Sequence, residues 1–149
     1  MSSDGRLFVI IVGCGRMGSY LANKLSADGH SVVAIDVNES AFAGLSAEYS
    51  GFRVQGDAAE FAVLKQNKTD KADLVIAATS DDNVNLMVAQ IAKRIFHVPR
   101  VIARIIYPRR GEFYRSQGIE TICPTSIAAE VFLESLKKPP IAAEGETTQ

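Results

Sequence analysis

The sequence predicts an α/β fold in which a parallel sheet carries helices on both faces. Uninterrupted apolar runs such as Phe8–Val12 are typical of strands buried on both sides. A helical period follows most of these runs, so strand and helix patterns alternate along the chain. Three glycines in the spacing G-x-G-x-x-G lie between the first strand and the first helix. Together these features predict a Rossmann-type doubly wound sheet of six strands in the order 3-2-1-4-5-6.

The first half of the chain is expected to supply three of the strands. After strand Phe8–Val12, a spacing of four between Met17, Leu21 and Leu25 predicts an amphipathic helix that ends near Gly29. The other predicted elements of this half are strand 31–35, a helix over 40–48, strand Phe52–Gln55, and a helix over 59–67 with Phe61 and Leu64 turned inward.

The second half continues the alternation. Its predicted elements are strand 74–78, a helix over Asp82–Arg94, strand 101–106, a helix over 110–117, strand 121–123 and a closing helix over 127–136. One apolar face of the first of these helices is expected to consist of Val84, Met87, Val88, Ile91 and Ile95. We therefore expect one domain over residues 1–136 and a disordered tail over residues 137–149.

The glycine spacing also indicates what the domain binds. Gly13 permits a sharp turn, Gly15 leaves room for a pyrophosphate beside the backbone, and Gly18 lets the helix pack closely on the strand. The free N–H groups and the dipole at the start of the helix favour an anion. The candidate phosphate site consists of Gly13, Cys14, Gly15, Arg16, Met17 and Gly18.

An acidic residue follows the second strand where dinucleotide-binding folds bind ribose. Asp36 lies about 20 positions beyond the glycine loop, as that fingerprint requires. Its carboxylate can accept hydrogen bonds from both ribose hydroxyls and would repel a 2'-phosphate, which favours NAD or a simple adenine nucleotide over NADP. Val37 and Asn38 complete this candidate ribose site. The alternative is that Asp36 only starts a turn with Asn38.

Two further strand ends are expected to meet the same crevice. The third strand ends at Gly56, Asp57 and Ala58, where the glycine admits a flat ring and Asp57 can accept from an adenine amino group or cap the next helix. At the end of the fourth strand, Ala78 keeps the crevice open and the Thr79 hydroxyl can reach ribose or phosphate. The alternative for this last stretch is a helix cap by the serine or aspartate that follows.

Three side chains near the crevice leave alternatives open. Arg104 lies within the apolar run VIARII, and a buried guanidinium needs an anion, which a core carboxylate, a bound nucleotide or an acid across a subunit interface could supply. Arg16 can reach a terminal phosphate or lie in solvent. Cys14 fills a variable position of the motif or makes binding redox-sensitive.

Composition and charge exclude several classes of function. The 149 residues, 47% of them hydrophobic, suffice for one domain with a full core. A net charge of -1 without a polybasic tract argues against nucleic-acid binding. No apolar run can span a bilayer and no signal peptide is evident, so we expect a cytoplasmic chain without direct membrane insertion.

The cysteines and histidines predict no reactive site. Cys14 and Cys123 are isolated, so neither a disulfide nor a metal site is predicted. His30 and His97 lie in expected loops, so no catalytic group is predicted.

Several stretches occur in an order typical of a known family. These stretches are IIVGCGRMGSYLANKLSADGHSVVAIDVNES, VQGDAAEFAVL, ADLVIAATSDDNVNL, VPRVIARI and GIETICPTSIAAE. Over residues 7–136 the chain resembles the N-terminal nucleotide-binding domain of TrkA/KtrA proteins, the RCK domains of bacterial potassium uptake systems. The combination of GxGRxG, GDA, AATxDDxxN and VIAR is far more specific than the glycines alone.

The resemblance implies a domain that binds NAD(H) or an adenine nucleotide (ATP, ADP or AMP). It also implies a homodimer or larger ring at the inner face of the membrane, beneath a K+ transporter subunit that nucleotide exchange would gate. By motif, the glycine loop would hold the phosphates, Asp36 the ribose, and Asp57 and Ala58 the adenine, with Ala78 and Thr79 as a wall. The closing helix resembles the crossover that contacts the partner subunit.

Two departures from the family pattern and one alternative function remain. Thr125 follows a proline where the family commonly has glutamate, which puts a divalent-cation role of that position in doubt. The usual C-terminal ligand-binding lobe is not in the chain, so we expect a short regulator or the nucleotide-binding part of something larger.

The alternative to a regulator is a small NAD-dependent oxidoreductase. Tyr107 and Tyr114, however, lack the following lysine of short-chain dehydrogenases. The prediction is therefore a regulator and not an enzyme.

Overall fold

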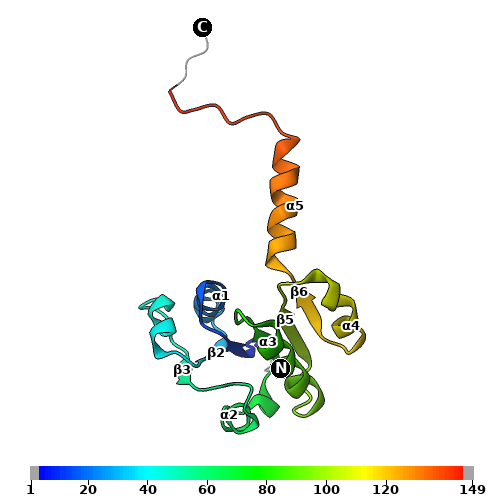
Figure 1. Cartoon of the computed structure of the whole chain (residues 1–149). Coiled ribbons are helices and arrows are strands. Elements are labelled where there is room, and N and C mark those ends of the chain that lie inside the picture. The colour runs from blue at the N-terminus through cyan, green and yellow to red at the C-terminus, as the bar shows by residue number, and fades with distance from the viewer. Residues whose placement is uncertain (1–3, 146–149) are drawn as a thin grey trace.

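The computed structural model describes residues 4–145, and its core is a six-stranded parallel sheet (Figure 1). The strand order is β3-β2-β1-β4-β5-β6, which confirms the predicted order and the Rossmann-type fold. The strands are β1 (Phe8–Val12), β2 (Ser31–Asp36), β3 (Phe52–Gln55), β4 (Leu74–Ala77), β5 (Arg100–Arg104) and β6 (Glu120–Ile122). Every neighbouring pair is parallel.

Helices cover both faces of the sheet. The α-helices are α1 (Arg16–Ala27), α2 (Phe61–Gln66), α3 (Asp82–Arg94), α4 (Gly111–Ser116) and α5 (Pro124–Leu136), and the 3-10 helices are η1 (Glu39–Gly44), η2 (Thr69–Lys71) and η3 (Pro108–Arg110). Strand β1 sends Ile11 into a core shared with α1 and η1, and Ile10 into a core shared with α2 and α3. Burial on both faces explains the unbroken apolar run of this strand.

The carboxyl end of β1 is fastened to both of its neighbours. Gly13 N donates to the Ile35 oxygen at 2.8 Å, and Ala78 N donates to the Val12 oxygen at 2.7 Å. These bonds hold the glycine loop between the ends of β2 and β4, where the strand order reverses direction. In sheets of this kind, ligands bind in the crevice at that point.

Two of the predicted helices are shorter than expected. The helix over 40–48 is only the 3-10 turn η1, because the Asn23 side chain binds main-chain groups of Gly44 and Ser46 and ends the helical pattern there. The helix over 59–67 is limited to α2. Phe61 is not turned inward as predicted: it stacks on Phe96 at the surface, with 5.1 Å between ring centroids.

Helix α3 has the predicted bounds, and the predicted face is confirmed in part, since Val88 is buried and Val84 and Ile91 pack against the core. The rest of the buried face differs. Met87 and Ile95 are exposed, whereas Asn85 and Ala89 are buried. Strand 101–106 is also shorter, since β5 ends at Arg104. Ile106 N donates to the Asp82 side chain of α3 at 2.8 Å, and this contact directs the chain after β5 away from the strand direction.

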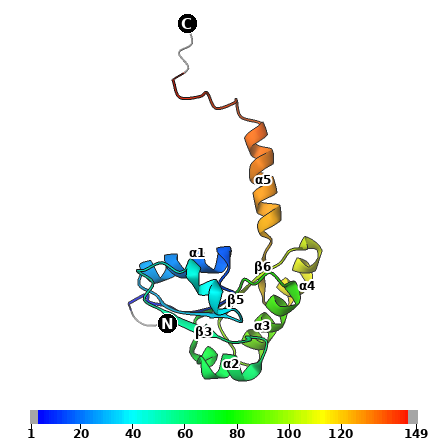
Figure 2. The same cartoon turned by 60° about the vertical axis from the view of Figure 1, so that its left-hand side comes forward.

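The remaining bounds differ from prediction by no more than a few residues, and the closing helix α5 begins earlier, at Pro124. This helix extends away from the sheet in both views (Figures 1 and 2), and none of its residues is buried. Beyond it, residues 139–145 form no helix or strand, and residues 146–149 of the predicted tail lie outside the described range. Within residues 4–145, no helix has the length and apolar character needed to cross a bilayer.

Candidate functional site

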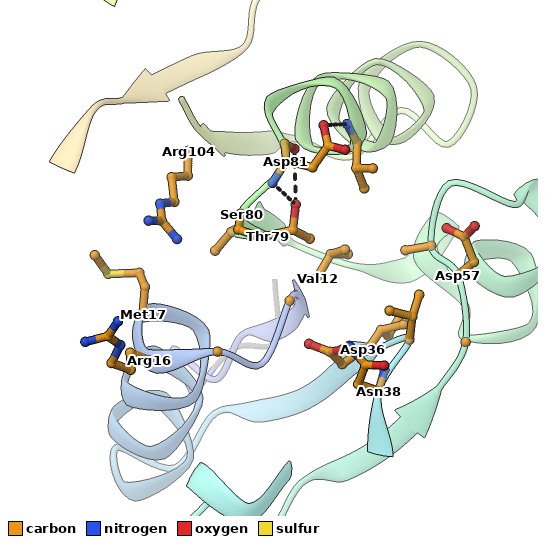
Figure 3. A pocket seen from close by; sticks show the side chains of 18 residues that line it. Val12, Arg16, Met17, Asp36, Asn38, Asp57, Thr79, Ser80, Asp81 and Arg104 are labelled. Carbon is orange, nitrogen blue, oxygen red and sulfur yellow. Dashed lines mark hydrogen bonds between the residues drawn. The ribbon is translucent and has the colours of Figure 1, made fainter. Parts of the chain in front are cut away.

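A pocket of about 720 Å³ opens at the carboxyl ends of the central strands (Figure 3). The glycine loop forms its floor, and its walls are the segments that follow β2, β3 and β4 together with the last residue of β5. Its lining residues are Val12, Gly13, Gly15, Arg16, Met17, Ile35, Asp36, Val37, Asn38, Gly56, Asp57, Ala58, Ala78, Thr79, Ser80, Asp81, Val84 and Arg104.

The three glycines of the loop have three different surroundings. Gly13 has φ +95°, and a Cβ there would lie 2.8 Å from Thr79 N, so both the turn and the close approach require glycine. A Cβ on Gly18 would lie 1.7 Å from the Gly13 oxygen. A Cβ on Gly15 would meet no atom within 4 Å. Gly15 therefore borders open space that a side chain would fill.

The start of α1 faces this space without a cap. Gly15 is the N-cap residue and supplies no side-chain hydrogen bond, and the first turn contains no acidic residue. The N–H groups and the positive end of the helix dipole therefore remain available to an anion. The structure fits the predicted phosphate site in this respect.

Asp36 both organises the loop and borders the pocket. Its Oδ2 accepts from Cys14 N at 2.7 Å, and its Oδ1 accepts from Asn38 N at 2.8 Å. The turn with Asn38, considered as an alternative, is therefore present together with the pocket-facing position. Each carboxylate oxygen retains a second lone pair, so both can still accept from a ligand hydroxyl.

Asp57 occupies a turn and not the cap of a helix. Its Oδ1 accepts from Ala59 N at 2.9 Å, while α2 begins only at Phe61. Gly56 N donates to the Asp36 oxygen at 2.9 Å, which joins the ends of β2 and β3. This end of the pocket thus has small residues and a carboxylate, as the prediction of an adenine site requires.

Asn85, which the sequence placed only on a helix, holds the wall at the end of β4. It is fully buried, and its Oδ1 accepts from Thr79 N at 2.9 Å and from Thr79 Oγ1 at 2.6 Å. Its Nδ2 donates to the oxygens of Thr79 and Arg104, each at 3.0 Å. We had expected the Thr79 hydroxyl to reach ribose or phosphate, but it donates to Asn85 instead.

The alternative considered for the same stretch, a helix cap, is present. Asp81 caps α3 and accepts from Asn83 N at 2.8 Å.

The charged side chains of the pocket lie in three places. Arg16 and Arg104 lie at the end near the start of α1, Asp36 and Asp57 lie at the other end, and Asp81 lies between them at the start of α3 (Figure 3). The Nε of Arg104 is buried and has no hydrogen-bond partner. None of the core carboxylates considered for Arg104 pairs with it among residues 4–145.

Two predicted site residues do not line the pocket. Gly18 packs behind the loop, and Cys14 is buried in the core beside α1, where it contributes only its N–H to Asp36. Burial, and secondarily the charge of Asp36, raises the pKa of the Cys14 thiol to about 11. The prediction missed the lining residues Val12, Ile35 and Val84. It placed Ser80 and Asp81 beside the crevice, with a helix cap as the alternative, but did not include them among the site residues. The signal that could have identified these residues is their position at strand ends and at the start of α3.

Comparison with known proteins agrees with this geometry. The family model described as the TrkA-N domain matches residues 9–124. The chain belongs to the TrkA-N domain family. A Trk system potassium uptake protein TrkA from Streptomyces coelicolor is 36% identical over 130 residues, which are 87% of this chain and 58% of the relative. This TrkA-N domain therefore spans less than two thirds of that relative.

Solved structures share the fold of this TrkA-N domain. The TrkA-N domain of the inner membrane protein ybaL from Escherichia coli superposes with a TM-score of 0.77 at 23% identity, covering 89% of this chain and 98% of that chain. The Kef CTD of Shewanella denitrificans, solved in an AMP-bound form, has a TM-score of 0.71 at 26% identity. That match covers 87% of this chain and 80% of the Kef chain.

Proposed function

We propose that this TrkA-N domain binds NAD(H) or an adenine nucleotide (ATP, ADP or AMP) and that the bound ligand regulates a K+ transport system. The observation that carries the proposal is the open space at Gly15, between the uncapped start of α1 and the carboxylate of Asp36. This arrangement suits a ligand with a phosphate and a ribose. The AMP-bound form of the Kef relative supports an adenine nucleotide.

Each part of the pocket would hold one part of the ligand. The phosphates would lie on Gly13 and Gly15, beside Arg16 and Met17, with Gly18 packing behind them. Asp36 would bind the ribose, next to Val37 and Asn38, and the adenine would lie beside Gly56, Asp57 and Ala58. Ala78, Thr79 and Arg104 would close the other side.

The regulatory role follows from the potassium-uptake relative together with a pocket shared among several strand ends. A ligand shifts a conformational equilibrium only by its different affinity for two states. The loops after β1, β2, β3 and β4 meet at the pocket, so a ligand there can favour one arrangement of these loops. The domain over residues 1–136 would act in the cytoplasm, on the inner face of the membrane, through a transporter subunit.

Helix α5 supports self-association. Its apolar residues Ile127, Val131, Phe132, Leu133 and Leu136 are all more than half exposed. Such a surface on a protruding helix is typical of an interface between subunits. We propose a homodimer, or a larger ring, in which α5 is covered by a second copy. Light scattering should give at least a dimer, and Phe132→Glu should shift the protein toward monomer.

An NAD-dependent oxidoreductase is the alternative. Such enzymes need a residue that transfers a proton near the nicotinamide. The pocket contains no histidine, lysine or tyrosine among its lining residues. Incubation with NAD(H) and common alcohols or aldehydes should give no turnover, and steady hydride transfer at enzymatic rates would overturn the regulatory proposal.

Calorimetry with variants of Asp36 tests the ligand assignment. Asp36→Ala should weaken adenine-nucleotide binding by about tenfold or more, because it removes a charged acceptor for the ribose hydroxyls. Asp36→Asn retains one acceptor and should lose less. Asp70→Ala removes an exposed carboxylate of η2, outside the pocket, and serves as the matched control. Equal affinity in wild type and Asp36→Ala would refute the ribose assignment.

A further inference from the structure

We infer that the chain has a second ligand site, for a small organic acid with an aromatic body, at the end of the sheet opposite the glycine loop. A cavity of about 560 Å³ lies there, beside the amino ends of β1, β2 and β3. Among residues 4–145, none that lines this cavity also lines the pocket at the glycine loop. The inference is therefore independent of the proposed function.

The cavity exists because helix α2 does not reach this end of the sheet. The helix has six residues and ends at Gln66, and Lys68 then turns the chain with a left-handed φ of 58°. Phe52 of β3 is in register with Val33 of β2, so both side chains point to the face of the sheet that packs against α2. Phe52 is nevertheless 72% exposed, because no helix covers it.

Apolar side chains from three strands line one part of the cavity. Val33 is buried, and Phe8 and Val54 pack against the same core cluster. The Phe52 ring borders the cavity beside them and is mostly uncovered. A flat apolar group that covers this ring is favoured both by the area it buries and by ring stacking. This part of the cavity therefore suits an aromatic ring system.

Hydrogen-bond donors line another part of the cavity. His30 Nδ1 accepts from Leu7 N at 3.0 Å, so the neutral ring carries its proton on Nε2, which can donate to a ligand. Lys68 adds a positive charge, and its ammonium group forms no ion pair within the described range. Among the described lining residues there is no aspartate or glutamate. Charge complementarity therefore favours a carboxylate beside these donors.

Two charged residues close to the cavity make other contacts. The Arg53 guanidinium lies over the Tyr49 ring, 5.4 Å from its centroid, and Tyr49 belongs to the core on the other face of the sheet. Asp73 accepts from Phe8 N at 2.8 Å and does not line the cavity. The charge offered to a ligand therefore comes mainly from Lys68, next to the aromatic surface of Phe52.

Nuclear magnetic resonance titration of the full chain with 2-naphthoate tests the inference. This probe has an aromatic body and a carboxylate, whereas 2-naphthamide keeps the rings without the charge and acetate keeps the charge without the rings. Naphthoate should bind saturably, at least about fivefold more tightly than either control compound. The amide signals of Ser31, Phe52 and Lys68 should shift, and that of Gly15 should not.

Variants separate the two parts of the site. Lys68→Gln should lose at least about fivefold in naphthoate affinity and less than about twofold in naphthamide affinity. Phe52→Ala should weaken both compounds by at least about fivefold, because both use the ring surface. The matched controls are Lys65→Gln and Phe113→Ala, which replace exposed side chains outside the cavity and should match wild type.

Four results would overturn the inference. They are no saturable binding at millimolar naphthoate, shifts centred on Gly15 or on α5, naphthamide binding as tight as naphthoate binding, and cavity signals that move with protein concentration alone. The last result would show that a second copy of the chain covers the cavity. If Phe52→Ala does not fold, the map of shifted amides and the Lys68→Gln titration decide.

Discussion

Gly18 packs so closely on Gly13 that a Cβ on Gly18 would lie 1.7 Å from the Gly13 carbonyl oxygen. The helix and the loop can approach each other in this way only because the third glycine of the motif has no side chain. We therefore predict that Gly18→Ala destabilises the domain by about 3 kcal/mol or more, at the upper end of overpacking costs. Urea unfolding followed by circular dichroism measures this loss. Gly15→Ala, with free space around its Cβ, should cost less than about 1 kcal/mol, and an equal loss in both variants would contradict the account.

Replacement of Asn85 should destabilise the fold, because Asn85 joins the ends of β4 and β5 at the pocket wall. Asn85→Ala leaves Thr79 N and the Arg104 oxygen without their buried partner. We expect a loss of about 2–4 kcal/mol in the free energy of unfolding. Asn83→Ala, two residues earlier on the same helix but exposed, should cost under about 0.5 kcal/mol. Similar losses for the two asparagines would show that the buried amide contributes little.

Lys68 occupies a backbone conformation that favours glycine. Its φ of 58° and ψ of 41° lie in the left-handed region. Lys68→Gly should stabilise the domain by about 0.5–1 kcal/mol, because the relief of Cβ strain exceeds the added entropy of the unfolded chain. Lys65→Gly, in the last turn of α2, should instead destabilise by about 1 kcal/mol. Denaturation midpoints measure both, and a destabilising Lys68→Gly would contradict the strain argument.

The buried Cys14 thiol should make the fold sensitive to alkaline pH. Burial raises its pKa from 9.0 to about 11, so the folded state favours the neutral thiol. The resulting stability is present below pH 9 and is lost as pH rises from 9 to 11. Tyr49, whose pKa burial raises to about 12, adds a similar loss above pH 10. The free energy of unfolding of Cys14→Ala should fall less steeply over pH 9–11 than that of Cys123→Ala, and parallel curves would exclude Cys14 as the cause.

The sequence predicted the parts of the fold that depend on short-range pattern. The apolar run of β1 and the spacing of Gly13, Gly15 and Gly18 specify a strand, a turn and a helix, and this motif together with the alternation of strands and helices predicted the strand order. The pocket could be placed for the same reason, because parallel strands end at a common edge.

Features that depend on tertiary contacts were not predictable in this way. The apolar period of α3 favours Met87 and Ile95 as core residues, yet the sheet lies against Asn85 and the small Ala89. Nothing local indicates that an asparagine amide will meet main-chain groups at the ends of both β4 and β5. The shortened η1 likewise results from hydrogen bonds with Asn23 of another element.

The central claim is tested most directly by calorimetric titration of wild type and Gly15→Val with ATP, ADP, AMP and NAD. The valine side chain would enter the open space at the start of α1, where its Cβ meets no protein atom within 4 Å, so the variant should fold normally. The account predicts one-site binding of at least one of these compounds to wild type and a loss of at least about tenfold in affinity in Gly15→Val. Absence of binding to wild type at millimolar concentration, or equal affinity in the folded variant, would contradict it.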